Sequence, residues 1–239
     1  MTGRTYRALD LFCCAGGASM GLHRAGFEVV GVDIRPQPRY PFAFFQGDAL
    51  KFPLDGFDFI WASPPCQAHT AMKTMHNAKP HDDLIPETRD RLKASGIPYV
   101  IENVVGAPLS GTFMLCGTMF GLGVEDADLQ RHRLFEPSFE IGLLPKCQHG
   151  ARSTIGVYGG GHIRNRKRAR TIGVYGEGAR DSRRKFDKGV TDFTVEQGRE
   201  AMGIDWMTIA ELSQAIPPAY AEFIGRAAIA TMDAERLAA

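Results

Sequence analysis

A short apolar run that two prolines stop sets narrow limits on how this chain folds. Residues 57–62 are almost entirely apolar, which predicts a buried strand. Pro64 and Pro65 end it, because each proline has a fixed φ and no N–H. Cys66 is therefore expected just beyond a strand end, where ligands bind in an open α/β sheet. The alternative is a buried structural cysteine, since free cysteines are commonly buried.

The first half of the chain predicts a doubly wound α/β sheet. The runs that indicate strands are residues 6–12, 27–32, 42–45, 57–62 and 99–101. Helical patterns cover residues 18–25 and 84–95. This alternation of strands and helices is typical of a parallel sheet.

Small and acidic residues follow the first three predicted strands and indicate one ligand edge. The small-residue turn at 13–17 lets a cofactor approach the backbone at a helix N-terminus. Asp33 can accept hydrogen bonds from both ribose hydroxyls, and Asp48 can accept one from an adenine amino group. The turn lacks G-x-G-x-x-G, so a dinucleotide is not indicated. Taken singly, Asp33 reads as a loop or cap acid and Asp48 as a turn residue.

Glu102 lies at the end of the fifth predicted strand. In a doubly wound order that strand neighbours the fourth, which places Glu102 near Cys66. A nucleophile and an acid on adjacent strand ends form a typical catalytic pair, although an acid at a strand end is commonly a surface or cap residue. The polar residues 67–83 predict a mobile loop that closes over a substrate.

Composition indicates an ordinary globular protein with one strongly basic segment. The 239 residues are 44% hydrophobic and 23% charged, with a net charge of +1. Between positions 151 and 188, eleven Lys and Arg residues stand against three acids, which is the pattern expected for phosphate contacts. The five cysteines are irregularly spaced, and we expect free thiols, a cytoplasmic location and no membrane span.

An internal repeat lies within the basic segment. Residues 154–159 recur unchanged as residues 171–176, which predicts two short strands, most simply as a structural hairpin repeat. The glycine-rich loops after them could approach DNA closely. Cys147, His149 and His162 could suggest zinc, but their spacing does not fit the common four-ligand patterns, so we predict no metal. Three helices are expected near 194–202, 208–214 and 219–237, and Thr208 with Glu211 predicts a capping box at the start of the second.

Four motifs in a fixed order resemble the DNA cytosine-5 methyltransferases. They are Asp10-Leu11-Phe12-Cys13-Cys14-Ala15-Gly16-Gly17, Pro64-Pro65-Cys66-Gln67, Glu102-Asn103-Val104 and Gln130-Arg131-His132-Arg133. The resemblance covers residues 8–136 and roughly 198–225, and the short variable region is similar to phage-type or orphan bacterial members. The chain departs from the family at Cys14, where glycine is usual, at Leu129, which takes the position of the Gln, and in the late motif at residues 213–218.

The resemblance implies a fold, a cofactor, a partner and a set of site residues. The fold is a Rossmann-like class I methyltransferase sheet, with a catalytic domain at 1–141, a target-recognition insertion at 142–196 and returning helices at 197–239. The cofactor is S-adenosyl-L-methionine, which leaves as S-adenosyl-L-homocysteine, and the partner is double-stranded DNA bound by a monomer. The implied catalytic residues are Cys66, Glu102, Arg131 and Arg133. The implied cofactor contacts are Phe12, Ala15, Gly16, Gly17, Asp33, Ile34, Asp48, Ala49 and Pro65. The DNA contacts expected are Gln67, Thr70, Arg164, Arg166, Arg168, Arg170, Arg180 and Arg183.

The expected reaction is methylation of cytosine C5 on a base flipped out of the duplex. Cys66 would add to C6 and so make C5 nucleophilic, while Glu102 and Arg133 would stabilise charge at N3 and O2. Two alternatives stay open. One is an exocyclic-amine (N4 or N6) methyltransferase, whose motif calls for an aromatic residue at position 66. The other is a non-catalytic DNA-binding homologue. An RNA substrate is a further alternative.

Overall fold

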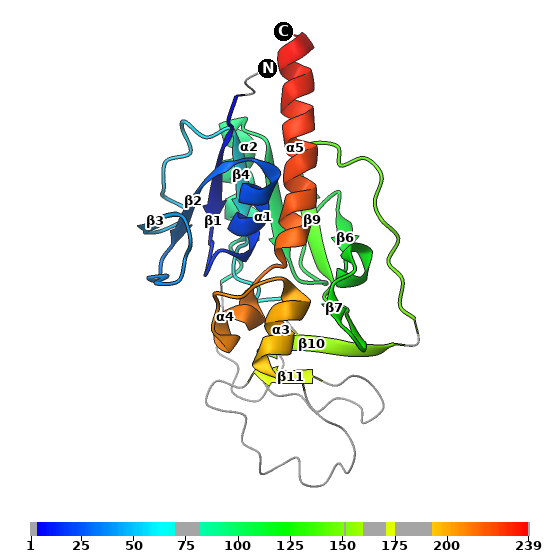
Figure 1. Ribbon diagram of the computed structural model, residues 1–239. Helices are drawn as coiled ribbons and strands as arrows, with labels where there is room; N and C mark the ends of the chain where they lie inside the picture. Colours follow the sequence, from blue (N-terminus) through cyan, green and yellow to red (C-terminus); the bar gives the residue numbers. More distant parts are fainter. Residues whose placement is uncertain (1–3, 70–81, 151, 160–170, 175–192, 239) are drawn as a thin grey trace. The chain divides into compact units, whose positions relative to one another are not determined.

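The computed structural model describes residues 4–69, 82–150, 152–159, 171–174 and 193–238. The chain forms two compact units (Figure 1). Unit 1 comprises Met1–Leu115, His132–Leu144 and Pro218–Ala239, and unit 2 comprises Cys116–Arg131 and Pro145–Pro217. These bounds differ from the predicted domain bounds, because 116–131 and 197–217 belong to unit 2; the functional division of the chain stays a prediction. No helix among the described residues is long and apolar enough to cross a membrane.

Unit 1 is built on a seven-stranded sheet in the order β3-β2-β1-β4-β5-β9-β6. Its strands are β1 (Arg7–Leu11), β2 (Glu28–Asp33), β3 (Ala43–Gln46), β4 (Phe59–Ala62), β5 (Tyr99–Asn103), β6 (Phe113–Leu115) and β9 (Arg133–Pro137). The first five are mutually parallel, and β9 is antiparallel to both β5 and β6. The predicted α/β fold class is therefore confirmed.

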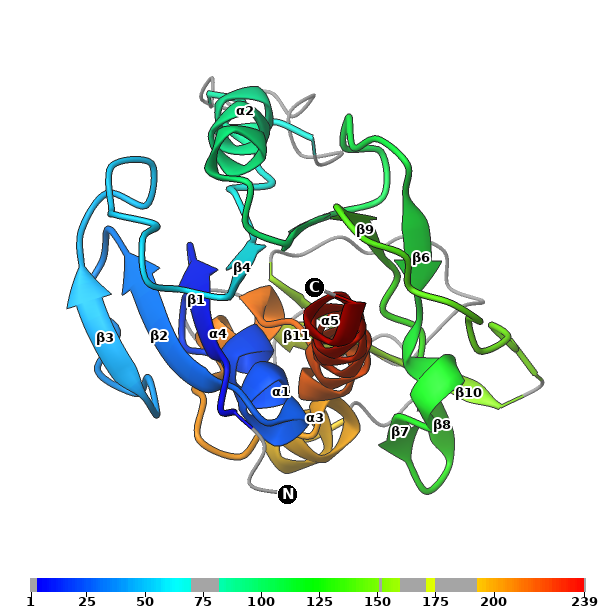
Figure 2. The same cartoon turned by 90° about the horizontal axis from the view of Figure 1, so that it is seen from above.

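Helices cover both faces of this sheet (Figure 2). Helix α2 (Ile85–Ser95) lies on one face, and α1 (Gly17–Ala25) and α5 (Pro218–Ala238) lie on the other, side by side. The close approach of α1 and α5 depends on glycine. A Cβ at Gly21 would lie 2.1 Å from the carbonyl oxygen of Pro218, so a larger residue would push the two helices apart.

The central strands are short and apolar because both of their faces are covered. All four residues of β4 are buried, and so are all five of β5. Leu9, Ile60 and Ile101 of three neighbouring strands belong to one buried cluster, with Leu92 of α2 packed into it. Such a core holds the strand ends in place, and those ends carry the predicted site.

The switch point of the sheet lies between β1 and β4. From β1 the chain passes through α1 to β2 on one side, and from β4 it passes through α2 to β5 on the other. The connections therefore diverge at the carboxyl ends of β1 and β4, which is where open α/β sheets bind ligands. The turn after β1 and the Pro-Pro-Cys loop after β4 lie at this edge.

Unit 2 contains a four-stranded sheet in the order β11-β10-β8-β7. Its elements are β7 (Gly123–Val124), β8 (Ala127–Leu129), β10 (Ser153–Gly159), β11 (Thr171–Val174), the 3-10 helix η2 (Gly117–Phe120), α3 (Val195–Met202) and α4 (Ile209–Gln214). The predicted cap of α4 is confirmed, since the Thr208 hydroxyl accepts from the backbone N–H of Glu211 and the Glu211 carboxylate accepts from that of Thr208.

The two repeats form strands as predicted, but they are not a hairpin. Tyr158 of β10 pairs with Gly173 of β11 in a parallel ladder. A hairpin would pair its strands antiparallel through a short turn, whereas a parallel pair requires a crossover connection. The intervening residues 160–170 lie outside the described part of the chain.

Candidate active site

Hydrogen bonds hold the loop after β4 in place. The backbone N–H of Ser63 donates to the carbonyl oxygen of Leu11 at 3.1 Å, which extends the β1–β4 pairing past the end of β4. The indole N–H of Trp61 donates to the Ser63 hydroxyl at 2.9 Å. These contacts explain why the chain stays ordered up to the prolines, which have no N–H to donate.

A buried amide ties the same loop to the neighbouring strand. The side-chain amide of Asn103, at the end of β5, donates to the carbonyl oxygen of Pro64 at 2.9 Å. Its own carbonyl oxygen accepts from the backbone N–H of Val104, so both ends of the side chain are used. Cys66, half-buried, follows two residues after Pro64, and its carbonyl accepts from the N–H of His69 in a tight turn. The loop that carries Cys66 is thus held against β5, the strand that carries Glu102.

Glu102 and Arg133 form an ion pair within unit 1. Glu102 is buried on β5, and the guanidinium Nε of Arg133 on β9 lies 3.2 Å from its Oε1. Glu102 stands directly opposite Phe135 in the antiparallel ladder, so Arg133 is its diagonal neighbour on the same face. The sequence placed Glu102 after the strand; it lies one residue before the last residue of β5.

Arg131 is held inside unit 2. Its guanidinium is buried and donates to the carbonyl oxygens of Val157 at 2.6 Å and Ser213 at 2.7 Å. These contacts join the end of β10 to the end of α4. The catalytic role expected for Arg131 stays a prediction, and its observed contacts are those of a positioning residue.

The turn after β1 has a strained backbone that faces Asp33. Phe12 and Cys14 have φ values of 60° and 46°, and Gly16 has 84°. The left-handed region costs a non-glycine residue roughly 1–2 kcal/mol. The Asp33 carboxylate offsets part of this cost by accepting the N–H of Cys14 at 2.9 Å, and its other oxygen accepts the N–H of Arg35 at 2.9 Å.

The remaining cofactor residues lie at the same edge of unit 1. Ile34, directly after β2, is 68% exposed, which is unusual for isoleucine and suits a residue that packs on a ligand. Asp48 caps a turn through the N–H of Leu50 and pairs with Lys51 at 3.4 Å, as expected for a turn residue. Ala49 is buried. Each cofactor assignment stays a prediction.

Three acidic side chains give this edge its electrostatic character. The carboxyl of Asp10 is buried on β1, and burial raises its pKa to about 7; Asp33 and Glu102 add to the rise, while the Ser19 hydroxyl bond opposes it. One Asp10 oxygen, Oδ1, has no hydrogen-bond partner among the described residues. A buried acceptor without a donor, beside two further acids, suits a cationic ligand.

The same surroundings keep two of the neighbouring thiols protonated. Burial, together with the charges of Asp33, Asp10 and Glu102, raises the pKa of the Cys14 thiol to about 12. Burial and the charges of Asp10 and Asp33 also raise the pKa of the Cys13 thiol. Since the thiolate is the nucleophilic form, Cys13 and Cys14 are unsuited to covalent chemistry, and Cys66 is the thiol left at this edge.

Sequence reasoning missed several residues that shape the site, and it could not place others. Asp10, Ser19 and Tyr40 form a hydrogen-bonded chain beside the β1 turn, with 2.8 Å between the hydroxyls of Ser19 and Tyr40. The sequence signal for this hydrogen-bonded chain was Asp10, an acid within an apolar strand. Thr70 and the six arginines expected to contact DNA lie outside the described residues, and Gln67 is exposed beyond Cys66.

Comparisons with solved structures agree on the architecture. A protein described as a DNA modification methyltransferase encoded within an Escherichia coli prophage aligns at TM-score 0.61 and 13% identity, over 96% of this chain and 100% of that chain. Dnmt2 methyltransferase of S. pombe aligns at 0.59 and 12%, over 95% and 99%. Entamoeba histolytica methyltransferase EhMeth aligns at 0.57 and 12%, over 96% and 99%.

This chain has the fold of these methyltransferases. At such identities the likeness concerns the fold alone, and the chemistry must be argued from the site. No protein-family model matches the sequence, and a search of curated proteins found no match.

Proposed function

We propose that this methyltransferase-fold protein transfers a methyl group from S-adenosyl-L-methionine to C5 of cytosine in DNA. The observation that supports this most directly is the hydrogen bond from Asn103 to Pro64. It holds the loop of Cys66 against β5, the strand that carries Glu102 of the Glu102–Arg133 pair. The motif resemblance and the methyltransferase fold support it independently.

The residues at the sheet edge fit the cofactor. S-adenosyl-L-methionine carries a sulfonium and an ammonium cation. Asp33 and the partly ionised carboxyl of Asp10 would provide negative charge for them. The Oδ1 of Asp10, which has no partner in the described part of the chain, would supply an acceptor, and exposed Ile34 would supply an apolar surface for adenine. When bound, the cofactor supplies an electrophilic methyl group.

The protein's own residues make cytosine reactive toward that methyl. In the proposed mechanism, the Cys66 thiolate adds to C6, which breaks the aromaticity of the ring and leaves C5 as an enamine carbon. Negative charge develops toward N3 and O2, where Glu102 and Arg133 would bond the ring. A base then removes the C5 proton, and the bond from C6 to sulfur breaks to restore Cys66.

The target base must leave the duplex, because C6 is not accessible within the stack. Flipping costs a few kcal/mol. The polar residues after Cys66 and the basic segment are the proposed DNA contacts, and all but Gln67 of the residues named for that role lie outside the described part of the chain.

A covalent trap tests the proposal. A duplex containing 5-fluorocytosine should form a denaturation-resistant complex with the wild type in the presence of S-adenosyl-L-methionine, since fluorine cannot leave as a proton does. Cys66→Ser should form none, and Cys14→Ser serves as a matched thiol control that still traps. Methylated-nucleoside mass spectrometry should find 5-methylcytosine; N4 or N6 methylation, or turnover by Cys66→Ser, would reject the mechanism.

A further inference from the structure

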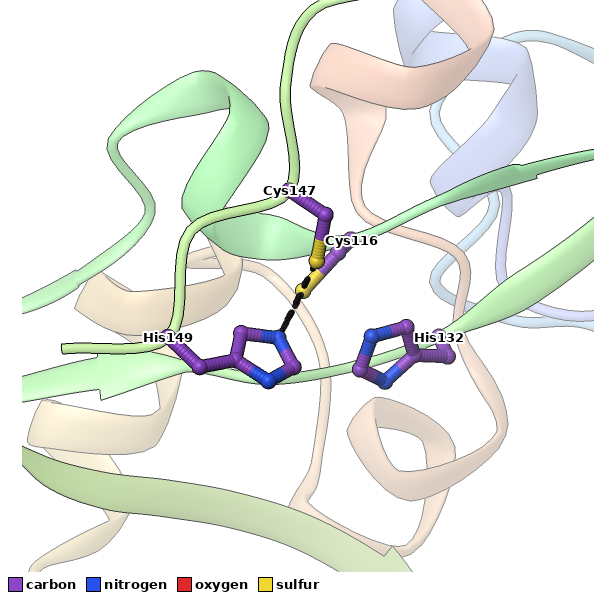
Figure 3. A group of neighbouring side chains, drawn as sticks. All are labelled: Cys116, His132, Cys147 and His149. Atoms are coloured by element: carbon purple, nitrogen blue, oxygen red, sulfur yellow. Dashed lines mark hydrogen bonds between the residues drawn. The ribbon is translucent and has the colours of Figure 1, made fainter.

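Two thiols and an imidazole converge within unit 2 (Figure 3). The Sγ of Cys147 lies 3.1 Å from Nε2 of His149, and the Sγ of Cys116 lies 3.4 Å from the same nitrogen. Cys116 is 33 positions away from His149 in the chain, so these contacts exist only because the fold brings two segments together.

His132 completes the group. It follows Arg131, the last residue of the first segment of unit 2, so a peptide bond holds it at the edge of that unit. One ligand atom from each of Cys116, His132, Cys147 and His149 lies within 4.8 Å of all the others. A hydrogen bond would bring only two of these side chains together. Four side chains of the types that bind zinc, gathered around one point, are the arrangement of a metal site.

We propose that Cys116, Cys147, His149 and His132 bind one zinc ion as a structural site. Two cysteines and two histidines are a donor set of closed, tetrahedral zinc sites. Zinc bonds of about 2.3 Å to sulfur and 2.0–2.1 Å to nitrogen place sulfur and nitrogen ligands about 3.6 Å apart in a tetrahedron. The two sulfur–nitrogen distances are within a few tenths of an ångström of that value.

One hydroxyl group contacts both ligand sulfurs. The Thr118 hydroxyl lies 3.3 Å from the Cys116 sulfur, to which it donates, and 3.8 Å from the Cys147 sulfur. The backbone N–H of Met119, in the first turn of η2, donates to the carbonyl oxygen of Cys116 at 3.0 Å, and the backbone N–H of Cys116 donates to the Met119 sulfur at 3.4 Å, so the backbone of Cys116 is held in place. Hydrogen bonds to ligand sulfurs orient them and stabilise their charge, and such contacts typically accompany protein metal sites.

The segment that carries two of the ligands is largely exposed and lies outside the helices and strands. Pro145 is half-buried, residues 146–150 are exposed, and none of these residues lies in a helix or strand. The ordering of such a segment costs conformational entropy that buried apolar contacts do not offset. A metal bond to Cys116 would anchor the segment just before β10 begins at Ser153.

The sequence alone predicted no metal, for a reason that the fold makes clear. Ligands at 116, 132, 147 and 149 follow none of the common zinc spacings. Those spacings consist of two pairs of ligands, with about two to five residues between the members of each pair. His162, the partner considered from the sequence, lies outside the described residues.

Metal content of the full-length protein tests the site. Protein purified in reducing buffer without chelator should contain about one zinc per chain. Cys147→Ser should reduce zinc to background; Cys147 is exposed, so its sulfur is not needed for packing. His149→Ala should do the same, while His23→Ala, which removes an exposed histidine of α1, should retain zinc.

Cobalt and a chelator give two further readouts. Cobalt added to metal-free protein should produce the thiolate charge-transfer band and the strong visible bands of a tetrahedral site, and Cys147→Ser should weaken both. A chelator should lower the melting temperature of the wild type but not of Cys147→Ser. Cys66→Ser should keep zinc while losing methyl transfer, so the two proposals fail separately. Wild type that binds neither metal, or that links Cys116 to Cys147 in a disulfide under these conditions, would overturn the site.

Discussion

The Nε of Arg133 lies 3.2 Å from the Oε1 of Glu102 across the antiparallel pair of β9 and β5. Only 16% of the Arg133 side chain and 7% of the Glu102 side chain are exposed, so water screens this pair weakly. In the proposed mechanism this pair would bond N3 and O2 on one edge of the cytosine ring, while the thiolate of Cys66 adds to C6.

Arg133→Ala should lower kcat about 10²–10³-fold, the usual cost of removing one donor to a developing charge. Arg89→Ala is the matched control. Arg89 binds the other end of β9 through two bonds of 2.7 Å to Glu136, where no chemistry is proposed. Arg89→Ala should reduce the free energy of unfolding, with turnover per folded molecule unchanged. Equal losses of turnover in both variants would contradict the role of Arg133.

Asn103→Ala should slow covalent trapping at Cys66 by about 10-fold or more, because a loop held loosely reaches the reactive geometry less often. The buried carbonyl of Pro64 would also lose its donor, at a cost of about 1–3 kcal/mol in stability. The measurement is the single-turnover trapping rate at a temperature where circular dichroism shows the variant folded. Trapping at the wild-type rate would show that the amide serves stability alone.

Asp10→Asn should flatten the pH dependence of stability. Burial raises the folded-state pKa of Asp10 from 3.8 to about 7. Below pH 3.8 the group is neutral in both states; as pH rises toward 7 the unfolded chain loses the proton first, so the free energy of unfolding falls, by about 4 kcal/mol at most. Urea unfolding at pH 5 and pH 8 should show this fall in the wild type and a smaller one in Asp10→Asn. An identical fall in both proteins would assign it to other groups.

Cys14→Gly should stabilise the protein by about 1 kcal/mol, because glycine adopts a φ of 46° without the strain that a side chain causes. Cys13→Gly is the control: this thiol is also buried, yet its residue is not among the strained positions, so the substitution should destabilise the protein. Thermal unfolding with and without S-adenosyl-L-methionine separates backbone strain from cofactor affinity. A lower melting temperature for Cys14→Gly would contradict the strain argument.

Local pattern was enough to locate the strands of the catalytic edge. Residues 57–62 predicted β4 to within two residues, because a strand buried on both faces must be short and apolar, and prolines leave no doubt about its end. The Thr208 cap of α4 could also be predicted from the sequence, because its hydrogen bonds join residues only three positions apart. Asp10 could be named as an acid within a strand, but not its link to Tyr40, 30 positions away in the sequence.

The sequence by itself determined the order of strands and helices, the parallel core of unit 1 and the loops that carry Cys66 and the acidic residues, because each depends on hydrophobic periodicity and on residues that stop it. Only the tertiary structure decided that the two repeats pair in parallel, that Arg133 meets Glu102, and that Cys116 joins Cys147 and His149. Those contacts join segments far apart in the chain, and no local preference of either segment specifies its distant partner.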